Sequence, residues 1–186
     1  MPRTSDKREK LIDAAAALFH HQGYGQTSLA DIAEHSGVPL GNVYYYFKTK
    51  DELANAVIHE RHGHLQALFD RCERDDEDPR QRLYCFLEAI VSSGGDITRH
   101  GCPIGGLCQE LNKDDNALAD KASALLGQSL AWITDQFNTM GHDNADQLAQ
   151  HFLAVLHGAS LLANTFGKES IIRDEARRLR DWIATV

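Results

Sequence analysis

The sequence is poor in residues that interrupt helices and in the features of exported or membrane proteins. It holds only four prolines in 186 residues, and helix-forming residues dominate almost throughout, which predicts an all-α fold. No apolar run approaches the roughly 20 residues that cross a bilayer, and the charged first ten residues lack a signal peptide's apolar segment. The four cysteines are scattered, which indicates a reducing compartment rather than a disulfide framework. We therefore expect a cytoplasmic protein.

The sequence patterns of catalytic and metal sites are also missing. There is no P-loop, no G-x-G-x-x-G and no G-x-S-x-G. The spacing of zinc fingers is absent, and the pair His59 and His62 is one residue too close for the zinc pattern H-E-x-x-H. We expect no catalytic residues, no metal and no cofactor. A small helical enzyme or carrier remains the rival from another class.

Positive charge is scarce, since the net charge is −8. Its distribution is uneven, because residues 1–50 hold six Lys or Arg against five Asp or Glu, whereas residues 51–186 hold thirteen against twenty-two. An acidic body repels phosphate and would orient the less acidic end toward DNA. An acidic surface also confers solubility without any such role, and both interpretations stay open.

What the sequence does contain is a pair of short amphipathic helices at residues 27–53. Leu29 and Ile32 recur at helical spacing, and Gly37 follows where a left-handed residue ends a helix. Pro39 then suits the first turn of a second helix, because its φ is already helical. This layout predicts a helix-turn-helix, whose second helix enters the DNA major groove.

The same stretch carries a set of residues at fixed spacings, namely Thr27, Ile32, Ala33, Gly37, Val38, Gly41, Val43, Tyr44, Tyr46, Phe47, Lys50 and Leu53. At these positions it resembles the N-terminal pattern of the TetR (tetracycline repressor) family of transcriptional regulators. The resemblance implies an N-terminal three-helix head over residues 1–47 and a C-terminal helical body over residues 48–186, with about nine helices in all. It also implies a homodimer that binds double-stranded operator DNA and responds to a small-molecule effector, most simply as a repressor released by that effector.

The predicted DNA contacts gather around the second helix. Leu40 and Asn42 lie near its start, where an apolar contact to a thymine methyl and a bidentate bond to adenine are possible. Hydroxyls and ammonium groups suit phosphate oxygens, although Tyr45 has the alternative of only packing on the head. The N-terminal arm either touches DNA or has no role. The full predicted set is Arg3, Thr27, Ser28, Pro39, Leu40, Asn42, Tyr44, Tyr45, Tyr46, Lys48 and Lys50.

The pattern of the remaining sequence predicts a series of helices, which end at glycines, prolines and charged turns. The resemblance makes the helix at residues 50–74 the link that carries a conformational change from body to head. Gly94 and Gly95 either fall within the helix expected at residues 80–98 or break it. The expected helices cover residues 6–22, 28–35, 39–45, 50–74, 80–98, part of 101–111, 116–140, 144–166 and 170–185.

The resemblance further implies that the last two helices form the dimer interface, with packing within one chain as the alternative. The residues expected there are Leu156, Ala159, Leu162, Ala163, Phe166, Leu179 and Ile183. A mostly apolar pocket with a few polar anchors is expected in the body. Its candidate ligand-binding residues are Cys102, Cys108, Asn112, Gln128, Trp132, His157 and Asn164.

Two of these residues carry an alternative mechanism. Cys102 and Cys108 lie six residues apart in a glycine-rich passage, and a thiol near a helix start can form a stabilised thiolate. The alternative function is therefore a regulator that senses oxidants or electrophiles through these thiols. The competing interpretation is two buried and inert cysteines.

Overall fold

The computed structural model describes residues 4–113 and 117–186, and over these residues the chain is helical without any strand. The predicted all-α fold is confirmed. The expected helix at residues 80–98 divides at Ser93, just before a Gly-Gly pair, so the described residues form ten helices. They are α1 (Thr4–His21), α2 (Leu29–Ser36), α3 (Leu40–Tyr46), α4 (Lys50–Asp75), α5 (Pro79–Ser92), α6 (Gly94–His100), α7 (Pro103–Leu111), α8 (Ala117–Thr139), α9 (Ala145–Phe166) and α10 (Ser170–Ile183).

The chain packs as two compact units. The first unit contains the described residues up to His62 together with Gly106–Leu125, and the second contains Gly63–Gly105 and Leu126–Val186. The division therefore falls within α4, α7 and α8. The functional division at residue 47 that the sequence predicts stays a prediction.

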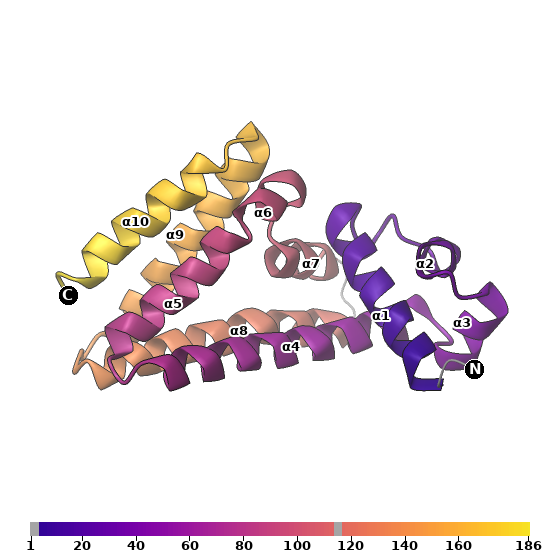
Figure 1. Ribbon diagram of the computed structural model, residues 1–186, viewed down its shortest axis with the longest axis horizontal. Coiled ribbons are helices and arrows are strands. Elements are labelled where there is room, and N and C mark those ends of the chain that lie inside the picture. The colour runs from indigo at the N-terminus through magenta and orange to yellow at the C-terminus, as the bar shows by residue number, and fades with distance from the viewer. Residues whose placement is uncertain (1–3, 114–116) are drawn as a thin grey trace. The chain divides into compact units, whose positions relative to one another are not determined.

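In the first unit, α2 packs against both α1 and α3 (Figure 1). Ser28 caps α2 by accepting a hydrogen bond from the Asp31 N–H, and the Asp31 carboxylate in turn accepts one from the Ser28 N–H. Gly37 ends α2 with φ at +68°, the left-handed conformation that glycine adopts most cheaply. Val43 and Phe47 are buried against this head, so the opposite side of α3 is left facing outward.

The loop between α1 and α2 is fixed by a carboxylate from α7. The backbone N–H of Gly25 donates to Oε2 of Glu110 at 2.9 Å. Gly23, with φ at +94°, ends α1 in a conformation that favours glycine, and a Cβ there would lie 2.8 Å from Oε1 of Glu110. This close approach explains why the helix stop at residue 23 is a glycine.

In the second unit, α9 and α10 run side by side, and both α5 and α6 pack against this pair (Figure 1). The centre of this unit is aromatic, since the rings of Phe69 and Trp132 stack at 4.6 Å and Phe86 lies 5.8 Å from Trp132. A second apolar cluster joins Ile97 of α6 to α9 and α10. These contacts bring α4, α5, α6, α8 and α9 around one interior.

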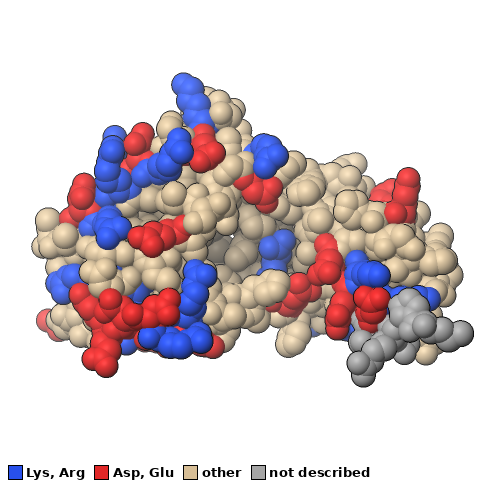
Figure 2. All heavy atoms as spheres, in the orientation of Figure 1, with Lys and Arg blue, Asp and Glu red and all other residues tan. Residues whose placement is uncertain are grey.

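The outer side of α10 is charged. Figure 2 shows basic and acidic side chains interleaved over this helix. Arg177 pairs with Asp174 at 3.2 Å, and Arg180 reaches Glu88 of α5 at 3.3 Å. Exposed pairs of this kind contribute little stability, but they leave this side of α10 with little apolar surface.

Cys72 of α4 and Cys85 of α5 form a disulfide bond. The sequence analysis expected scattered cysteines rather than a disulfide framework, and for Cys72 and Cys85 this expectation is wrong. Thirteen residues separate the two cysteines in the sequence, and the turn at residues 76–78 returns the chain so that they meet. The free thiols are Cys102 and Cys108.

No helix in the described part of the chain is both long enough and apolar enough to span a lipid bilayer.

Candidate functional site

The exposed side of α3 carries the side chains predicted to read DNA. Leu40 is 40% exposed, Tyr44 48% and Tyr45 71%, while Asn42 is partly buried. The alternative in which Tyr45 packs on the head is wrong, because its ring is the most exposed of the three tyrosines and Tyr46 is the half-buried one. Among the described residues, no other part of the chain covers the exposed leucine and tyrosines of this helix.

The two lysines that follow α3 have different surroundings. Lys48 is exposed, and its ammonium donates to the carbonyl of Tyr44 at 2.7 Å, a local bond that solvent or phosphate can replace. Lys50 turns inward, where its ammonium donates to the Tyr24 carbonyl at 2.8 Å and lies 4.2 Å from the centre of the Tyr24 ring. The geometry thus gives Lys50 a role in the packing of the head, whereas Lys48 is exposed on its surface.

Thr27 and Ser28, two of the predicted DNA contacts, lie at the start of α2, where the structure does not present the Thr27 hydroxyl to DNA. Thr27 is only 2% exposed, and its hydroxyl donates to the Gly23 carbonyl at 2.7 Å while accepting from the amide of Gln22. The Thr27 hydroxyl therefore stabilises the turn and does not face a phosphate. Ser28 is exposed, but the hydrogen bonds from its hydroxyl and backbone N–H hold the pKa of Asp31 below its ordinary value. A carboxylate already occupies this helix end and repels a second anion.

Pro39 begins α3 through its backbone. Its carbonyl accepts hydrogen bonds from the N–H groups of Asn42 at 2.7 Å and Val43 at 3.2 Å, without any side-chain cap. The proline ring is exposed, so it remains a candidate for van der Waals contact only. Arg3, the remaining predicted contact, lies outside the described residues.

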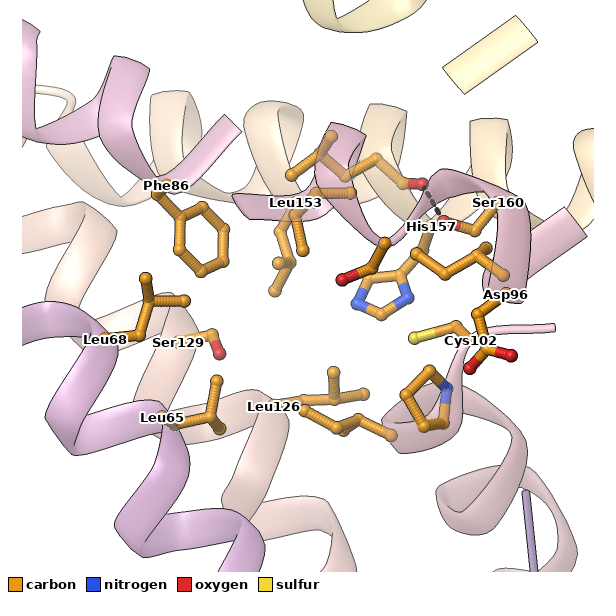
Figure 3. A pocket seen from close by; sticks show the side chains of 16 residues that line it. Leu65, Leu68, Phe86, Asp96, Cys102, Leu126, Ser129, Leu153, His157 and Ser160 are labelled. Atoms are coloured by element: carbon orange, nitrogen blue, oxygen red, sulfur yellow. Dashed lines mark hydrogen bonds between the residues drawn. The ribbon is translucent and has the colours of Figure 1, made fainter. Parts of the chain in front are cut away.

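The second unit contains a cavity of about 190 Å³. Figure 3 shows its side chains converging from α4, α5, α6, α8, α9, the first residues of α7 and the turn before α7. Most of them are aliphatic or aromatic, and few are polar. The apolar lining is Leu65, Leu68, Phe86, Ile90, Ile97, Pro103, Ile104, Leu126, Leu153 and Leu156, and the polar lining is Ser93, Asp96, Cys102, Ser129, His157 and Ser160.

Comparison with known proteins agrees with this architecture. Residues 11–57 match the model of the family described as bacterial regulatory proteins, tetR family. The HTH-type transcriptional regulator LmrA of Bacillus subtilis (strain 168) is 33% identical over 166 residues, which cover 86% of this chain and 87% of that protein. The chain belongs to the TetR family of transcriptional regulators.

Solved structures of TetR-family regulators share the fold at lower sequence identity. A TetR transcriptional regulator from Chloroflexus aurantiacus J-10-FL superimposes with a TM-score of 0.86 and 23% identity, over 99% of this chain and 97% of that one. A TetR-family regulator from Agrobacterium tumefaciens gives a TM-score of 0.87 at 20% identity, over 96% and 98% of the two chains. At this level of identity the likeness concerns the fold alone.

Within this TetR-family chain, Cys102 and His157 interact at one end of the cavity. Cys102 Sγ also accepts a hydrogen bond from the Gly105 N–H at 3.3 Å, and Figure 3 shows the sulfur close to the imidazole. Burial raises the pKa of the Cys102 thiol, but the hydrogen bond and charge of His157 and the backbone N–H groups of Gly105 and Ile104 outweigh it, so the pKa is lowered overall. The hydrogen bond to Cys102 raises the pKa of His157 despite its burial. Both shifts favour a thiolate facing an imidazolium.

The other five candidate ligand residues lie away from the cavity lining. Trp132 stacks in the aromatic core, and its Nε1–H donates to Glu73 at 2.7 Å. Cys108 is buried in the first unit, where its thiol donates to the Ala122 carbonyl at 3.1 Å. Three amides form hydrogen bonds with neighbouring groups instead of facing the cavity, namely those of Asn112, Gln128 and Asn164.

Sequence reasoning missed Ser129 and Ser160. Ser129 lies in the buried stripe of α8, four residues after Leu125 and four before Ile133, both of which are fully buried. Ser160 follows Leu156 on α9 by the same spacing, and its hydroxyl donates to the Leu156 carbonyl at 2.8 Å. A hydroxyl inside an otherwise apolar stripe is the pattern that could have identified both positions.

The residues expected at the dimer interface fall into two groups. Leu162 and Phe166 are 47% and 60% exposed on α9, and their neighbour Leu161 is 61% exposed. The other five are buried by the chain itself, so their side chains have no surface left for a partner. They are Leu156, Ala159, Ala163, Leu179 and Ile183.

Proposed function

We propose that this TetR-family regulator is a ligand-responsive repressor, which binds a palindromic operator as a homodimer and releases it when a small molecule enters the cavity. The observation that carries the proposal is a mostly apolar cavity with a few polar groups, in a chain whose first unit exposes the helix α3. Such cavities are the usual form of small-molecule sites. An uncovered helix bearing Leu40, Asn42 and Tyr44 is suited to the major groove.

The cavity limits the size and polarity of the ligand. Its volume of about 190 Å³ is below the roughly 300–1,000 Å³ of drug-sized pockets and just above the ~150 Å³ of an apolar cavity that holds benzene. A neutral molecule with one ring and a polar substituent fits these limits. Ser129 and His157 can then form hydrogen bonds with that substituent.

The homodimer is supported by the apolar patch of α9, which we define as Leu161, Leu162 and Phe166. All three side chains are substantially exposed although they are large and apolar. Large apolar side chains exposed close together on one helix are typical of an interaction surface. Association of two copies through this patch would hold two α3 helices at a fixed separation, as a palindromic operator requires.

Helix α4 provides the route from ligand to DNA. It starts at Lys50, four residues after α3 ends, and its residues Leu65 and Leu68 line the cavity. A ligand that fits better when these two leucines move favours one state of α4 over another, which is a population shift. The proposed consequence is a pair of recognition helices that no longer match successive major grooves.

The experiment combines DNA binding with a cavity-filling variant. Fluorescence anisotropy with DNA from upstream of the gene measures operator affinity, and phenol, toluene and benzaldehyde serve as probes. At least one probe is expected to raise the melting temperature and weaken DNA binding by tenfold or more, equivalent to about 1.4 kcal/mol. Leu126→Trp, which fills the cavity from α8, should bind DNA normally and lose both responses.

Two results would contradict the proposal. Wild-type protein that shows no sequence-preferring, salt-dependent DNA binding is not a regulator of this kind. A probe that weakens DNA binding equally for wild type and Leu126→Trp acts outside the cavity. Sedimentation equilibrium gives the independent test of the homodimer.

Thiol sensing remains the second candidate function, and one observation favours it for Cys102. That thiol lines the cavity beside His157, whereas Cys108 is buried elsewhere and bonded to a backbone carbonyl. Thiol sensing is therefore a candidate function of Cys102 and not of Cys108.

A further inference from the structure

The Cys102 thiol is held in a polar corner of an otherwise apolar cavity. Cys102 directly precedes α7, and His157 projects from α9, so two separate elements position the pair. A Cβ at position 105 would lie 3.3 Å from Nδ1 of His157 and 3.6 Å from Sγ of Cys102. Glycine at this position lets the imidazole and the sulfur share the space at the first turn of α7.

These surroundings are those of a nucleophilic sulfur. The Gly105 N–H donates to Sγ, and an imidazole in contact with a thiol can accept its proton and then stabilise the thiolate. Thiolate, not thiol, attacks electrophilic carbon. Asp96 of α6 is the other titratable side chain that lines the cavity in the described residues, and it is exposed. The pair therefore reacts in a setting governed mainly by His157 and the α7 backbone.

The apolar lining of the cavity determines which compounds can reach Cys102. Its walls are mainly leucine, isoleucine and phenylalanine, which disfavour charged or strongly hydrated reagents. Cys102 supplies the only thiol of the lining among the described residues, since Cys72 is bonded to Cys85 and Cys108 lies elsewhere. An intramolecular disulfide has no second thiol here, so addition to carbon is the reaction that the site can complete by itself.

We propose that the cavity captures a small neutral conjugated carbonyl compound, about the size of a single-ring enone or quinone, by covalent addition to Cys102. His157 takes the thiol proton, and Sγ forms a bond to the β-carbon of the conjugated double bond. The π pair of that double bond forms a new double bond between the α-carbon and the carbonyl carbon, and the carbonyl π pair moves to oxygen. His157 then returns the proton to the resulting enolate. The product is a thioether, nothing leaves and no oxidant is consumed.

The consequence for DNA binding rests on the proposed function, but adduct formation does not. Cys102 adjoins α7, and the same cavity is lined by Leu65 and Leu68 of α4. An adduct occupies the cavity permanently, so it would hold the protein in the ligand-bound state without a high affinity for the free compound.

The test uses the full chain with cyclohexenone, whose double bond is conjugated to the carbonyl, and cyclohexanone as the unreactive control of matched shape. Intact-mass spectrometry is expected to show one cyclohexenone per chain, and peptide mapping should assign it to Cys102. Cys102→Ser should remain unlabelled, whereas Cys108→Ser, which keeps a donor for the Ala122 carbonyl, should label at the wild-type rate. An adduct at Cys108, or equal labelling of Cys102→Ser, would overturn the proposal.

The role of His157 is tested separately. His157→Gln keeps a hydrogen-bonding side chain but loses the base, and should slow labelling at neutral pH by roughly 10²-fold. Its labelling rate should also reach half of its maximum at a higher pH than that of wild type. An unchanged rate and pH profile would refute the assignment of His157 as the proton acceptor.

DNA binding then separates this inference from the proposed function. An adduct on Cys102 with unchanged operator affinity supports covalent capture and contradicts ligand-induced release. If cyclohexenone forms no adduct, and both compounds release the protein from DNA equally well, covalent capture is overturned and the proposed function is supported.

Discussion

The contrast between Lys48 and Lys50 gives the sharpest prediction for the head. The resemblance to the family suggests two equivalent phosphate contacts, but the structure separates them. The Lys50 ammonium donates to the Tyr24 carbonyl and lies over the Tyr24 ring, while Lys48 is exposed. We therefore expect Lys50→Met to destabilise the head and Lys48→Met to weaken DNA binding.

The magnitude follows from the two interactions of Lys50. A hydrogen bond to a charged group contributes about 1.5–3 kcal/mol and an exposed cation–π contact about 0.5–1 kcal/mol. Lys50 is only partly buried, so the lower ends apply and Lys50→Met should cost about 2 kcal/mol. For a chain of this length that destabilisation lowers the melting temperature by roughly 4–8 °C. Lys48→Met breaks no buried contact and should leave the melting temperature nearly unchanged.

DNA binding should show the opposite pattern. Removing one lysine–phosphate interaction reduces the slope of log affinity against log salt concentration by about 0.9. A dimer carries two copies, so Lys48→Met should flatten the slope by about 1.8, equally for all DNA sequences. Circular dichroism melting and anisotropy titrations over a range of salt concentrations measure both quantities. If Lys50→Met flattened the slope and left the melting temperature unchanged, the inward assignment of Lys50 would be refuted.

Three further predictions concern base reading, dimerisation and the thiol. Asn42→Ala should reduce discrimination among operator variants by about 1–3 kcal/mol in competition binding, and equal discrimination would remove Asn42 from base readout. Phe166→Glu should shift sedimentation toward monomer because it puts a charge into the apolar patch of α9, whereas an intact dimer would exclude this patch from the interface. The thiolate absorbance of Cys102 should titrate below the ordinary pKa of 9.0. His157→Gln should raise the pKa of Cys102, because burial raises it and the hydrogen bond and charge of His157 no longer lower it. A pKa that fell in this variant would contradict the proposed pairing.

Much of the fold follows from local sequence patterns. The stop at Gly37, the start at Pro39 and the apolar spacing between them predicted α2 and α3 to within a residue or two. Helix ends are set by neighbours in sequence, so they can be recognised without tertiary information. The break at Ser93 was harder to predict, because a Gly-Gly pair can continue a helix at a modest energetic penalty, and only the packing of α6 against α9 decides the direction of the chain.

The candidate site was harder to predict because residue type does not report what a side chain touches. Thr27 and Lys50 match the family pattern of DNA contacts, yet one hydroxyl is buried in a turn and one ammonium is bonded to a carbonyl 26 residues away in the sequence. Trp132 and Asn164 have the character of ligand anchors but form contacts elsewhere. Cys102 and His157 are 55 residues apart, and only the fold brings them into one corner of the cavity.

Five of the seven residues predicted for the dimer interface are buried within the chain itself, for a related reason. Helical periodicity predicts which positions of α9 are apolar, but burial within one chain and burial between two chains require the same apolar residues. Ala159 and Ala163 are small because other helices of the same chain approach them, and both are buried without any partner. Leu161, Leu162 and Phe166 of the same helix remain exposed. Large apolar side chains left uncovered after the chain has folded are therefore a better indication of a partner than a stripe of small residues.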